Sequence, residues 1–411
     1  MRRRLLGAFG AGLLSRLLQF AVAVLLARAI GPEGFGAFVF ATGAALVGAQ
    51  LAGLGWPMLS QKHIAGMRGT GEQRGLRELA GSAELTLLLS ACLLAVLLAA
   101  VSLSLADTAL RSGLLATAGL LPLVAWRKLR RQQLLGLSRP ALGLSVDDVL
   151  PPTLVLLAVA LGLAGGAGSA LFAYGAGSML AVVLGSVVLL RAIGRPRLAP
   201  WSRWRSWSGE ALPMMLGGLS KVALARADVL LLAPLASLAE VGLYGVAYRL
   251  TYLFTFPQVI VGAVYGPRIA AAHARRNWRQ RQRLQATAYR FALLSVVPLA
   301  IALVWLREPV LGQLFGEPYR EAAAVLAVLC LAQTLGALAV PLGNYLLMTG
   351  GEVRYSQLNT IAAVINVGLN LALIPRFGAL GAALALTVCN AGVWCAEWLL
   401  VRHSHRRAES S

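Results

Sequence analysis

A succession of long apolar runs, each near the length that crosses a lipid bilayer, dominates the sequence. A helix rises about 1.5 Å per residue, so it needs about 20 apolar residues to span a hydrocarbon core about 30 Å thick. About twelve such runs are bounded by charge, glycine or proline, and they cover residues 5–29, 35–59, 79–103, 110–126, 141–164, 169–190, 211–234, 241–265, 286–306, 322–348, 357–374 and 379–401. The chain is therefore predicted to be an all-α integral membrane protein with about twelve transmembrane helices.

Composition supports this class, since 58% of the 411 residues are hydrophobic and only 13% are charged. The four cysteines lie in apolar runs without the spacing of a zinc site, and they are predicted to be core residues. The four histidines fall in the segments between apolar runs or in the C-terminal tail. No metal site and no cofactor are expected.

The basic residues are distributed unevenly across the predicted membrane. The chain has 37 Lys and Arg against 16 Asp and Glu, a formal charge of +21. If the N-terminus is cytoplasmic, 28 of the 37 basic residues fall in inside segments and five fall outside. This is the bias of the positive-inside rule, and it predicts that both termini are cytoplasmic.

Two basic segments contain tryptophan and superficially resemble a nucleic-acid surface, namely residues 201–207 (WSRWRSW) and 275–284 (RRNWRQRQRL). Since apolar runs flank both segments, we interpret them as interfacial, with tryptophan at the lipid headgroups and arginine facing anionic lipid. No nucleic-acid partner is expected.

A weak internal repeat divides the chain into halves at residues 1–200 and 201–411. GLLSR, which ends at Arg16, is echoed by GGLSK, which ends at Lys221, and residues 34–41 are echoed by 240–247. Six runs precede the second copy, so both halves have the same orientation. Two parallel six-helix lobes around a central cavity are a transporter architecture. Chance similarity between helices rich in leucine, glycine and alanine is the alternative.

The repeat pairs two cations deep in the bilayer. Arg16 lies about 16 Å from the start of the first run, and Lys221 lies about 15 Å from the start of the seventh. Arg249 lies about 12 Å from the outer surface, and Arg226 is also within a run. A central basic residue costs about 2.5–3.5 kcal/mol to insert, so we expect Arg16 and Lys221 to face an interior cavity. Arg226 lies five residues after Lys221, on another side of the helix, and resembles a packing or snorkelling cation more closely.

Polar residues at helical spacing extend the same faces. Gln19 follows Arg16 by three positions and Asp228 follows Lys221 by seven, so both are predicted to line the cavity. The alternative is that the cations pair with carboxylates and only hold helices together. Asp228 is the one equally deep carboxylate, whereas headgroups and water are expected to solvate five others near span ends, namely Glu84, Asp147, Asp148, Glu210 and Glu397.

A cavity lined by unneutralised cations favours an anion. Arginine matches phosphate with its planar donor fork and lysine adds a point charge, so a diphosphate is the expected ligand of Arg16 and Lys221, with weaker contributions from Arg226 and Arg249. The sequence contains no GxxxxGK[ST], HExxH or GxSxG motif. We therefore predict no catalytic residues and no enzymatic activity.

The segments ARAIGPEGFGAF (27–38) and LGWPMLSQKHIA (54–65) resemble the opening of the polysaccharide transporters, or oligosaccharidyl-lipid flippases, of the multidrug/oligosaccharidyl-lipid/polysaccharide exporter superfamily. Residues 225–250 are similar to the family's seventh and eighth spans, so the likeness reaches both halves. The resemblance implies a multi-pass protein of the bacterial inner membrane that flips a polyprenyl-diphosphate-linked oligosaccharide by alternating access. The cargo would be an O-antigen, capsule or exopolysaccharide repeat unit.

The resemblance also implies membrane lipid and the lipid-linked oligosaccharide as partners, with a glycan polymerase or glycosyltransferase acting beside a monomeric chain. Na⁺, H⁺ and the membrane potential alone are the candidate driving forces. Two other functions stay open: a cation-coupled antiporter for drugs or metabolites, which would depend chiefly on Asp228, and a membrane-embedded glycan-processing enzyme.

Overall fold

The computed structural model describes the backbone of residues 2–410 and the side chains of residues 10, 12, 14–215, 218 and 226–404. No strand occurs between residues 2 and 410, and nearly all of this range is helical. The chain forms two compact units, Met1–Ala233 and Pro234–Ser411.

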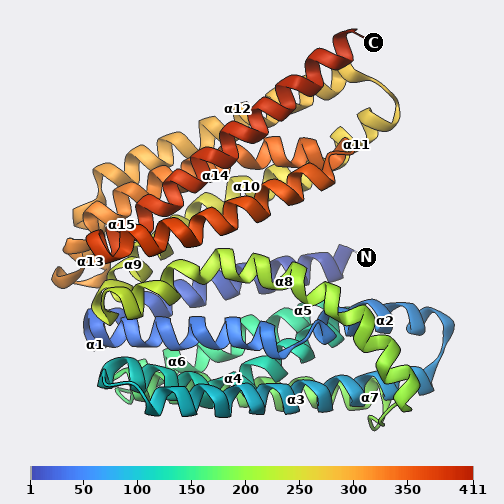
Figure 1. Cartoon of the computed structure of the whole chain (residues 1–411), viewed down its shortest axis with the longest axis vertical. Helices are drawn as coiled ribbons and strands as arrows, with labels where there is room; N and C mark the ends of the chain where they lie inside the picture. The colour runs from blue at the N-terminus through green and yellow to red at the C-terminus, as the bar shows by residue number, and fades with distance from the viewer. Residues whose placement is uncertain (1, 411) are drawn as a thin grey trace. The chain divides into compact units, whose positions relative to one another are not determined.

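Unit 1 consists of long helices and one short π-helical segment (Figure 1). Its helices α1, α4 and α3 pack side by side, and α4 also packs against α7. The elements in chain order are α1 (Arg2–Ala52), α2 (Trp56–Thr70), α3 (Gln73–Leu103), α4 (Thr108–Gly136), α5 (Pro140–Leu144), the π-helix η1 (Ser145–Val149), α6 (Leu150–Ala160), α7 (Ala167–Ile193) and α8 (Trp201–Leu235).

Unit 2 is built around the packing of α14 against α15 and α12. Its elements are α9 (Leu238–Leu250), the 3₁₀ segment η2 (Thr251–Phe254), α10 (Thr255–Ile260), the π-helix η3 (Val261–Tyr265), α11 (Gly266–Ala274), α12 (Trp278–Trp305), α13 (Arg307–Phe315), the 3₁₀ segment η4 (Glu317–Ala322), α14 (Ala323–Met348) and α15 (Glu352–Ser410). The boundary between the units lies near the end of α8, whereas the internal repeat assigns this helix to the second lobe.

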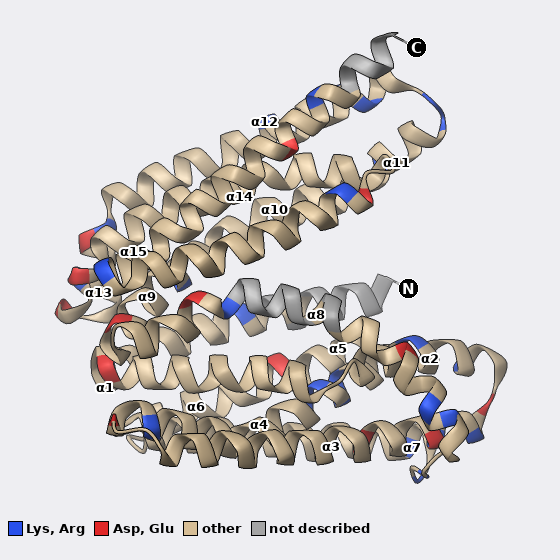
Figure 2. Cartoon of the chain, in the orientation of Figure 1, with Lys and Arg blue, Asp and Glu red and all other residues tan. Residues whose placement is uncertain are grey.

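The predicted apolar runs coincide with helical segments along the whole chain. Two long helices, α1 and α15, each join two helical segments that correspond to separate apolar runs. The segments meet at a glycine with non-helical backbone angles, Gly31 (φ 70°) in α1 and Gly378 (φ 55°) in α15. Within the described residues, eight helices are long and apolar enough to cross a membrane. Charged residues lie mostly toward the helix ends and connecting segments (Figure 2). The predicted all-α membrane fold with two lobes is confirmed.

A carboxylate fixes the interruption of α15. The backbone N–H of Ala379, which begins the second half of the helix, donates a 2.8 Å hydrogen bond to Glu240 Oε2 on α9. A Cβ added at Gly378 would lie 2.8 Å from the same oxygen. The positive φ and this close approach together require glycine.

The start of α8 differs from the interfacial segment predicted for residues 201–207. Trp207 is 6% exposed and packs edge-on against Trp56, while Trp204 Nε1 donates a 2.9 Å hydrogen bond to Thr86 on α3. Arg203 pairs with Glu78 at 2.5 Å. The headgroup prediction was wrong for Trp207, which is buried in the protein, whereas Trp201 is 70% exposed.

The cysteines also divide into two kinds. All four are free thiols. Cys330 and Cys389 are buried as predicted, whereas Cys92 and Cys395 are exposed. The prediction that all four are core residues was therefore wrong for the last two, which lie on outer faces of apolar helices.

Candidate functional site

The first half of α1 carries two of the predicted site residues. Gln19 is half-buried, and its Nε2 donates a 3.0 Å hydrogen bond to Ser15 Oγ one turn earlier. Arg16 follows Ser15 directly, and its side chain is exposed. Ser15 is itself 5% exposed, so one edge of this turn is packed against protein while Arg16 occupies the open edge.

The second half of α1 packs along α8, and small residues permit the close approach. A Cβ added at Gly55, just beyond α1, would lie 1.9 Å from the carbonyl oxygen of Ala211. A Cβ at Gly218 would lie 2.2 Å from Gln50 Nε2, and one at Gly43 would lie 3.6 Å from Val229 Cγ1. The contact positions move from residue 55 back to residue 43 on the α1 side while they move from residue 211 forward to residue 229 on α8. The helix α8 is therefore antiparallel to this half of α1.

Asp228 lies on α8 beside this contact. It is 7% exposed, and its Oδ1 accepts a 2.9 Å hydrogen bond from the backbone N–H of the neighbouring Val229. Arg226, two positions earlier, is half-buried. The sequence predicts that Asp228 and Arg226 lie deep in a membrane span. In the structure both lie in α8, in the part that follows the close approach at Gly218.

The remaining two predicted residues lie elsewhere. Lys221 falls within α8, but its side chain is outside the described residues. Arg249 lies in α9 of unit 2, half-buried, with its guanidinium carbon 5.3 Å from the centre of the Tyr252 ring. Five of the six predicted residues thus belong to unit 1 and Arg249 belongs to unit 2. The shared anion site stays a prediction.

Unit 1 contains a buried charge network that the sequence analysis missed. Asp147, on the π-helix η1, is 3% exposed, and Arg127 on α4 is 2% exposed. Arg127 Nε lies 2.9 Å from Asp147 Oδ1. Arg131 Nη1 lies 2.7 Å from Asp147 Oδ2, and Lys128 Nζ lies 3.4 Å from the same oxygen. Three cations from α4 therefore surround one buried carboxylate.

The other guanidinium nitrogens of Arg127 are satisfied by α7. Nη1 donates a 3.0 Å hydrogen bond to Ser178 Oγ, and Nη2 donates one of 3.0 Å to the Tyr174 hydroxyl. The guanidinium carbon also lies 5.2 Å from the centre of the Tyr174 ring. A buried ion pair needs such additional partners to offset the loss of hydration. This cluster joins α4, η1 and α7.

A second buried arginine lies one turn further along α4. Arg130 is 3% exposed, and its Nη2 contacts Glu84 Oε1 at 2.5 Å. Its Nε donates to Ser186 Oγ at 2.8 Å, and its Nη1 donates to Gln133 Oε1 at 2.7 Å. The helix α4 thus continues to Gly136, beyond the apolar run predicted to end at residue 126, and two arginines of this extension, Arg127 and Arg130, are buried.

The five carboxylates that were expected to be solvated at span ends differ in their exposure. Asp147 and Glu397 are 3% and 2% exposed, so the expectation was wrong for both. Glu210 agrees with it: its side chain is 34% exposed and pairs with Lys62 and with His63 Nε2, the latter at 2.8 Å. Hydrogen bonds from Lys62 and then His63 lower the pKa of Glu210, although partial burial opposes them. Glu84 and Asp148 are intermediate, with side chains 20% and 30% exposed.

These contacts weaken one step of the sequence argument. Asp228 is not the one buried carboxylate available to cations, since Asp147 is buried among three of them. Structural pairing of buried cations with a carboxylate therefore does occur in this chain, at the contacts of α4 with Asp147. Among the side chains that the structure describes, no group of three or more His, Cys, Asp or Glu residues could hold a metal ion.

Comparison with known families gives the class of protein. The sequence model of the family described as polysaccharide biosynthesis protein matches residues 6–273, well over half of the chain. The chain belongs to the polysaccharide biosynthesis protein family. A second model, described as lipid II flippase MurJ, matches residues 152–410. Together they support the predicted membership of the multidrug/oligosaccharidyl-lipid/polysaccharide exporter superfamily and a transporter rather than an enzyme.

Solved structures of this superfamily share the fold. An inward-facing multidrug resistance MATE family transporter aligns with a TM-score of 0.75 at 16% identity, covering 97% of this chain and 96% of its own. Lipid II flippase MurJ in an inward closed conformation aligns with a TM-score of 0.73 at 14% identity, covering 96% and 87%. At these identities the likeness concerns the fold alone.

A curated relative matches part of the chain. The probable low-salt glycan biosynthesis flippase Agl15 of Haloferax volcanii is 24% identical over 159 residues, which are 38% of this chain. The chain spans about one third of that relative's length.

Proposed function

We propose that this family member is a flippase for a polyprenyl-diphosphate-linked oligosaccharide. In this proposal it works by alternating access in the inner membrane of a bacterium and moves an O-antigen, capsule or exopolysaccharide repeat unit from the inner to the outer leaflet. The observation that carries the proposal is the family match over residues 6–273, a segment that contains every predicted anion-site residue. The relative from Haloferax volcanii, described as a probable glycan biosynthesis flippase, supports the same substrate class.

The chemistry of the intramembrane cations supports a diphosphate as the recognised group. Arg16 and Lys221 would contact the diphosphate, Arg226 and Arg249 would add weaker attraction, and Gln19 and Asp228 would line the same site. Arginine and lysine together supply both bidentate and point-charge contacts to phosphate oxygens. With the cytoplasm negative, outward movement of an anion gains about 2.3 kcal/mol per charge for each 100 mV.

The test is the double variant Arg16→Ala/Lys221→Ala in a strain that depends on this chain for surface glycan. We expect lipid-linked oligosaccharide to accumulate on the cytoplasmic face and surface glycan to fall about tenfold or more, because two charge-assisted contacts worth about 1.5–3 kcal/mol each are lost. The swap Arg16→Lys/Lys221→Arg, which keeps both charges, should retain most of the export.

The matched control is Arg111→Ala/Arg376→Ala, which removes two exposed arginines predicted on the outer side. Normal surface glycan in Arg16→Ala/Lys221→Ala, with normal amounts of protein in the membrane, would refute the diphosphate assignment. A strain in which Asp228→Asn alone abolishes transport while the double variant remains active would instead favour a cation-coupled antiporter.

A further inference from the structure

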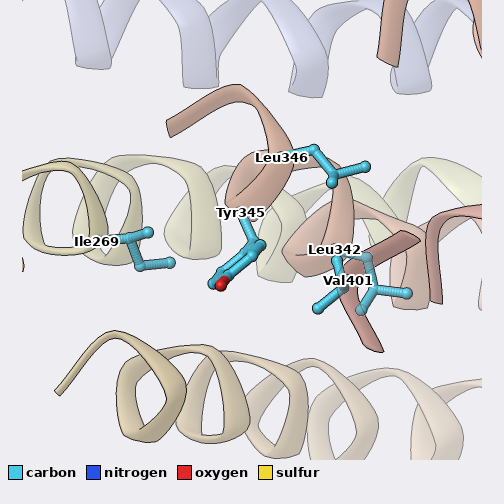
Figure 3. Packing of buried hydrophobic residues seen from close by; sticks show 5 residues of the cluster. All are labelled: Ile269, Leu342, Tyr345, Leu346 and Val401. Atoms are coloured by element: carbon cyan, nitrogen blue, oxygen red, sulfur yellow. The ribbon is translucent and has the colours of Figure 1, made fainter. Parts of the chain in front are cut away.

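A cavity of about 610 Å³ lies in unit 2, between α12 and the last part of α15. Its apolar wall includes Leu342 and Val401, which belong to a buried cluster with Ile269, Tyr345 and Leu346 (Figure 3). Two aromatic residues, Tyr289 from α12 and Trp398 from α15, complete this side. The cavity therefore has a packed hydrocarbon-like surface on one side.

The rest of the wall is cationic. Arg290 and Arg402 both line the cavity, and both side chains are exposed. The guanidinium carbon of Arg402 lies 5.1 Å from the centre of the Trp398 ring, which holds this charge over the aromatic face. No carboxylate is among the described residues that line the cavity, and within the described part of the chain neither arginine forms an ion pair.

The side-chain amide of Gln285, in the same wall, has an unused hydrogen-bond donor and acceptor among the described residues. Gln285 is 5% exposed. Neither its Nε2 nor its Oε1 has a hydrogen-bond partner among the described residues. A buried amide without partners costs free energy, so a ligand that supplies an acceptor to Nε2 would be stabilising here.

The position along both helices places this wall at the predicted edge of the hydrocarbon core, just below the lipid headgroups. The apolar run of α12 begins at about residue 286, and the last run of α15 ends at about residue 401. Arg290 is thus about 6 Å inside the predicted boundary, and Trp398 is about 4.5 Å inside it. Tryptophan and tyrosine favour this depth, where one side is apolar and the other is wet.

We propose that the cavity binds the phosphate of an anionic phospholipid headgroup, held by Arg290 and Arg402, with the start of an acyl chain against Tyr289 and Trp398. A soluble phosphate or diphosphate would satisfy the arginines but would leave the exposed ring of Trp398 in contact with water. A phospholipid supplies a phosphate to the cationic part of the wall and an acyl chain to its apolar part. The site is for a resident lipid, so it does not depend on which substrate the protein transports.

The test uses purified full-length protein in neutral detergent micelles that contain brominated phosphatidylglycerol or brominated phosphatidylcholine. Bromine quenches tryptophan fluorescence at contact distance, and subtraction of the signal of Trp398→Phe isolates the site. We expect phosphatidylglycerol to quench Trp398 at lower concentration than phosphatidylcholine. Arg290→Gln/Arg402→Gln should weaken phosphatidylglycerol binding about tenfold or more, since each basic residue near a membrane surface contributes about 1 kcal/mol toward anionic lipid.

Two further variants keep the result interpretable. Arg290→Lys/Arg402→Lys retains the charges and should recover most of the preference for phosphatidylglycerol. Arg268→Gln/Arg354→Gln removes two exposed arginines of the same unit that do not line the cavity, and it should leave binding unchanged. Equal weakening by the Arg268/Arg354 pair, equal quenching by both lipids, or displacement by inorganic pyrophosphate but not by unbrominated phosphatidylglycerol would each overturn the proposal.

Discussion

At the scale of single residues, the arginines of this chain differ widely in burial. Arg127 and Arg130 are buried and have carboxylate and hydroxyl partners on neighbouring helices. Arg16, by contrast, is exposed on α1 and lies in an apolar helix. The buried arginines connect helices within unit 1.

Removing the charge of Asp147 tests the role of this network. Asp147→Asn leaves Arg127 buried without its carboxylate, and breaking one partner of a buried pair typically costs about 3–5 kcal/mol. We therefore expect a large drop in the unfolding temperature of the purified protein in detergent, measured by intrinsic fluorescence.

The matched comparison is Asp107→Ala. Asp107 caps α4 by accepting hydrogen bonds from the backbone N–H groups of Ala109 and Leu110 at 2.8 and 3.2 Å. Loss of a helix cap costs about 1 kcal/mol. If Asp147→Asn lowers the unfolding temperature no more than Asp107→Ala does, the buried network does not stabilise unit 1.

The spacing of basic residues on α4 indicates the network around Asp147, but a count of basic residues on each side of the membrane does not reveal it. Arg127 and Arg131 are spaced i and i+4, so one helical face presents both. The positive-inside rule assigns them to a loop, because basic residues are usually solvated there. The contact with Asp147 depends on how far α4 extends and on the π-helical turn of η1, and neither is visible in hydropathy.

At the scale of elements, the helices follow from physics that acts locally. Bilayer thickness sets the length of an apolar run, so the runs could be read directly from the sequence. The merging of two runs into α1 and two into α15 depends on a single glycine in each, Gly31 and Gly378. The packing of Trp204 and Trp207 into the protein depends on tertiary partners that the sequence pattern cannot reveal.

The two glycines allow a paired measurement. Both have positive φ with ψ near 180° (Gly31) or −133° (Gly378), a conformation that is essentially restricted to glycine, so alanine at either position costs about 1–3 kcal/mol in backbone energy. A Cβ at Gly31 meets nothing within 4 Å, whereas a Cβ at Gly378 meets the carboxylate of Glu240. We expect Gly378→Ala to lower the unfolding temperature more than Gly31→Ala, because it also displaces the acceptor of the Ala379 N–H.

The combination Gly378→Ala/Glu240→Ala distinguishes crowding from backbone strain. If crowding contributes, the added cost of Gly378→Ala should shrink when the carboxylate is already absent. Equal losses for Gly31→Ala and Gly378→Ala in the wild-type background would show that φ alone matters at both positions.

At the scale of the whole molecule, the family and the two-lobe fold were predictable, whereas the grouping of α8 was not. Family motifs and charge bias are properties of the linear sequence. The packing of α8 along α1 requires the close approaches at Gly55 and Gly218, which only the three-dimensional structure reveals. The anion site stays a prediction, because Arg249 belongs to unit 2 and the other predicted residues belong to unit 1.

The orientation of the chain is a prediction that reporter fusions can measure. Because 28 basic residues fall on one predicted side and five on the other, both termini are expected in the cytoplasm. Green fluorescent protein fused after Ser411 should fluoresce, and alkaline phosphatase fused there should be inactive. Alkaline phosphatase inserted after Gly316, in the predicted outside segment between α13 and η4, should be active. The opposite pattern would invert the assignment of every loop.

The antiparallel contact between α8 and α1 has a mechanical consequence. Arg16 and Lys221 are in different copies of the internal repeat, yet the helices that carry them both belong to unit 1. If transport involves a rotation of one unit, Arg16 and Lys221 would move together with unit 1. A bound diphosphate could then keep both counterions from one side of the membrane to the other, and its release would require something other than their separation.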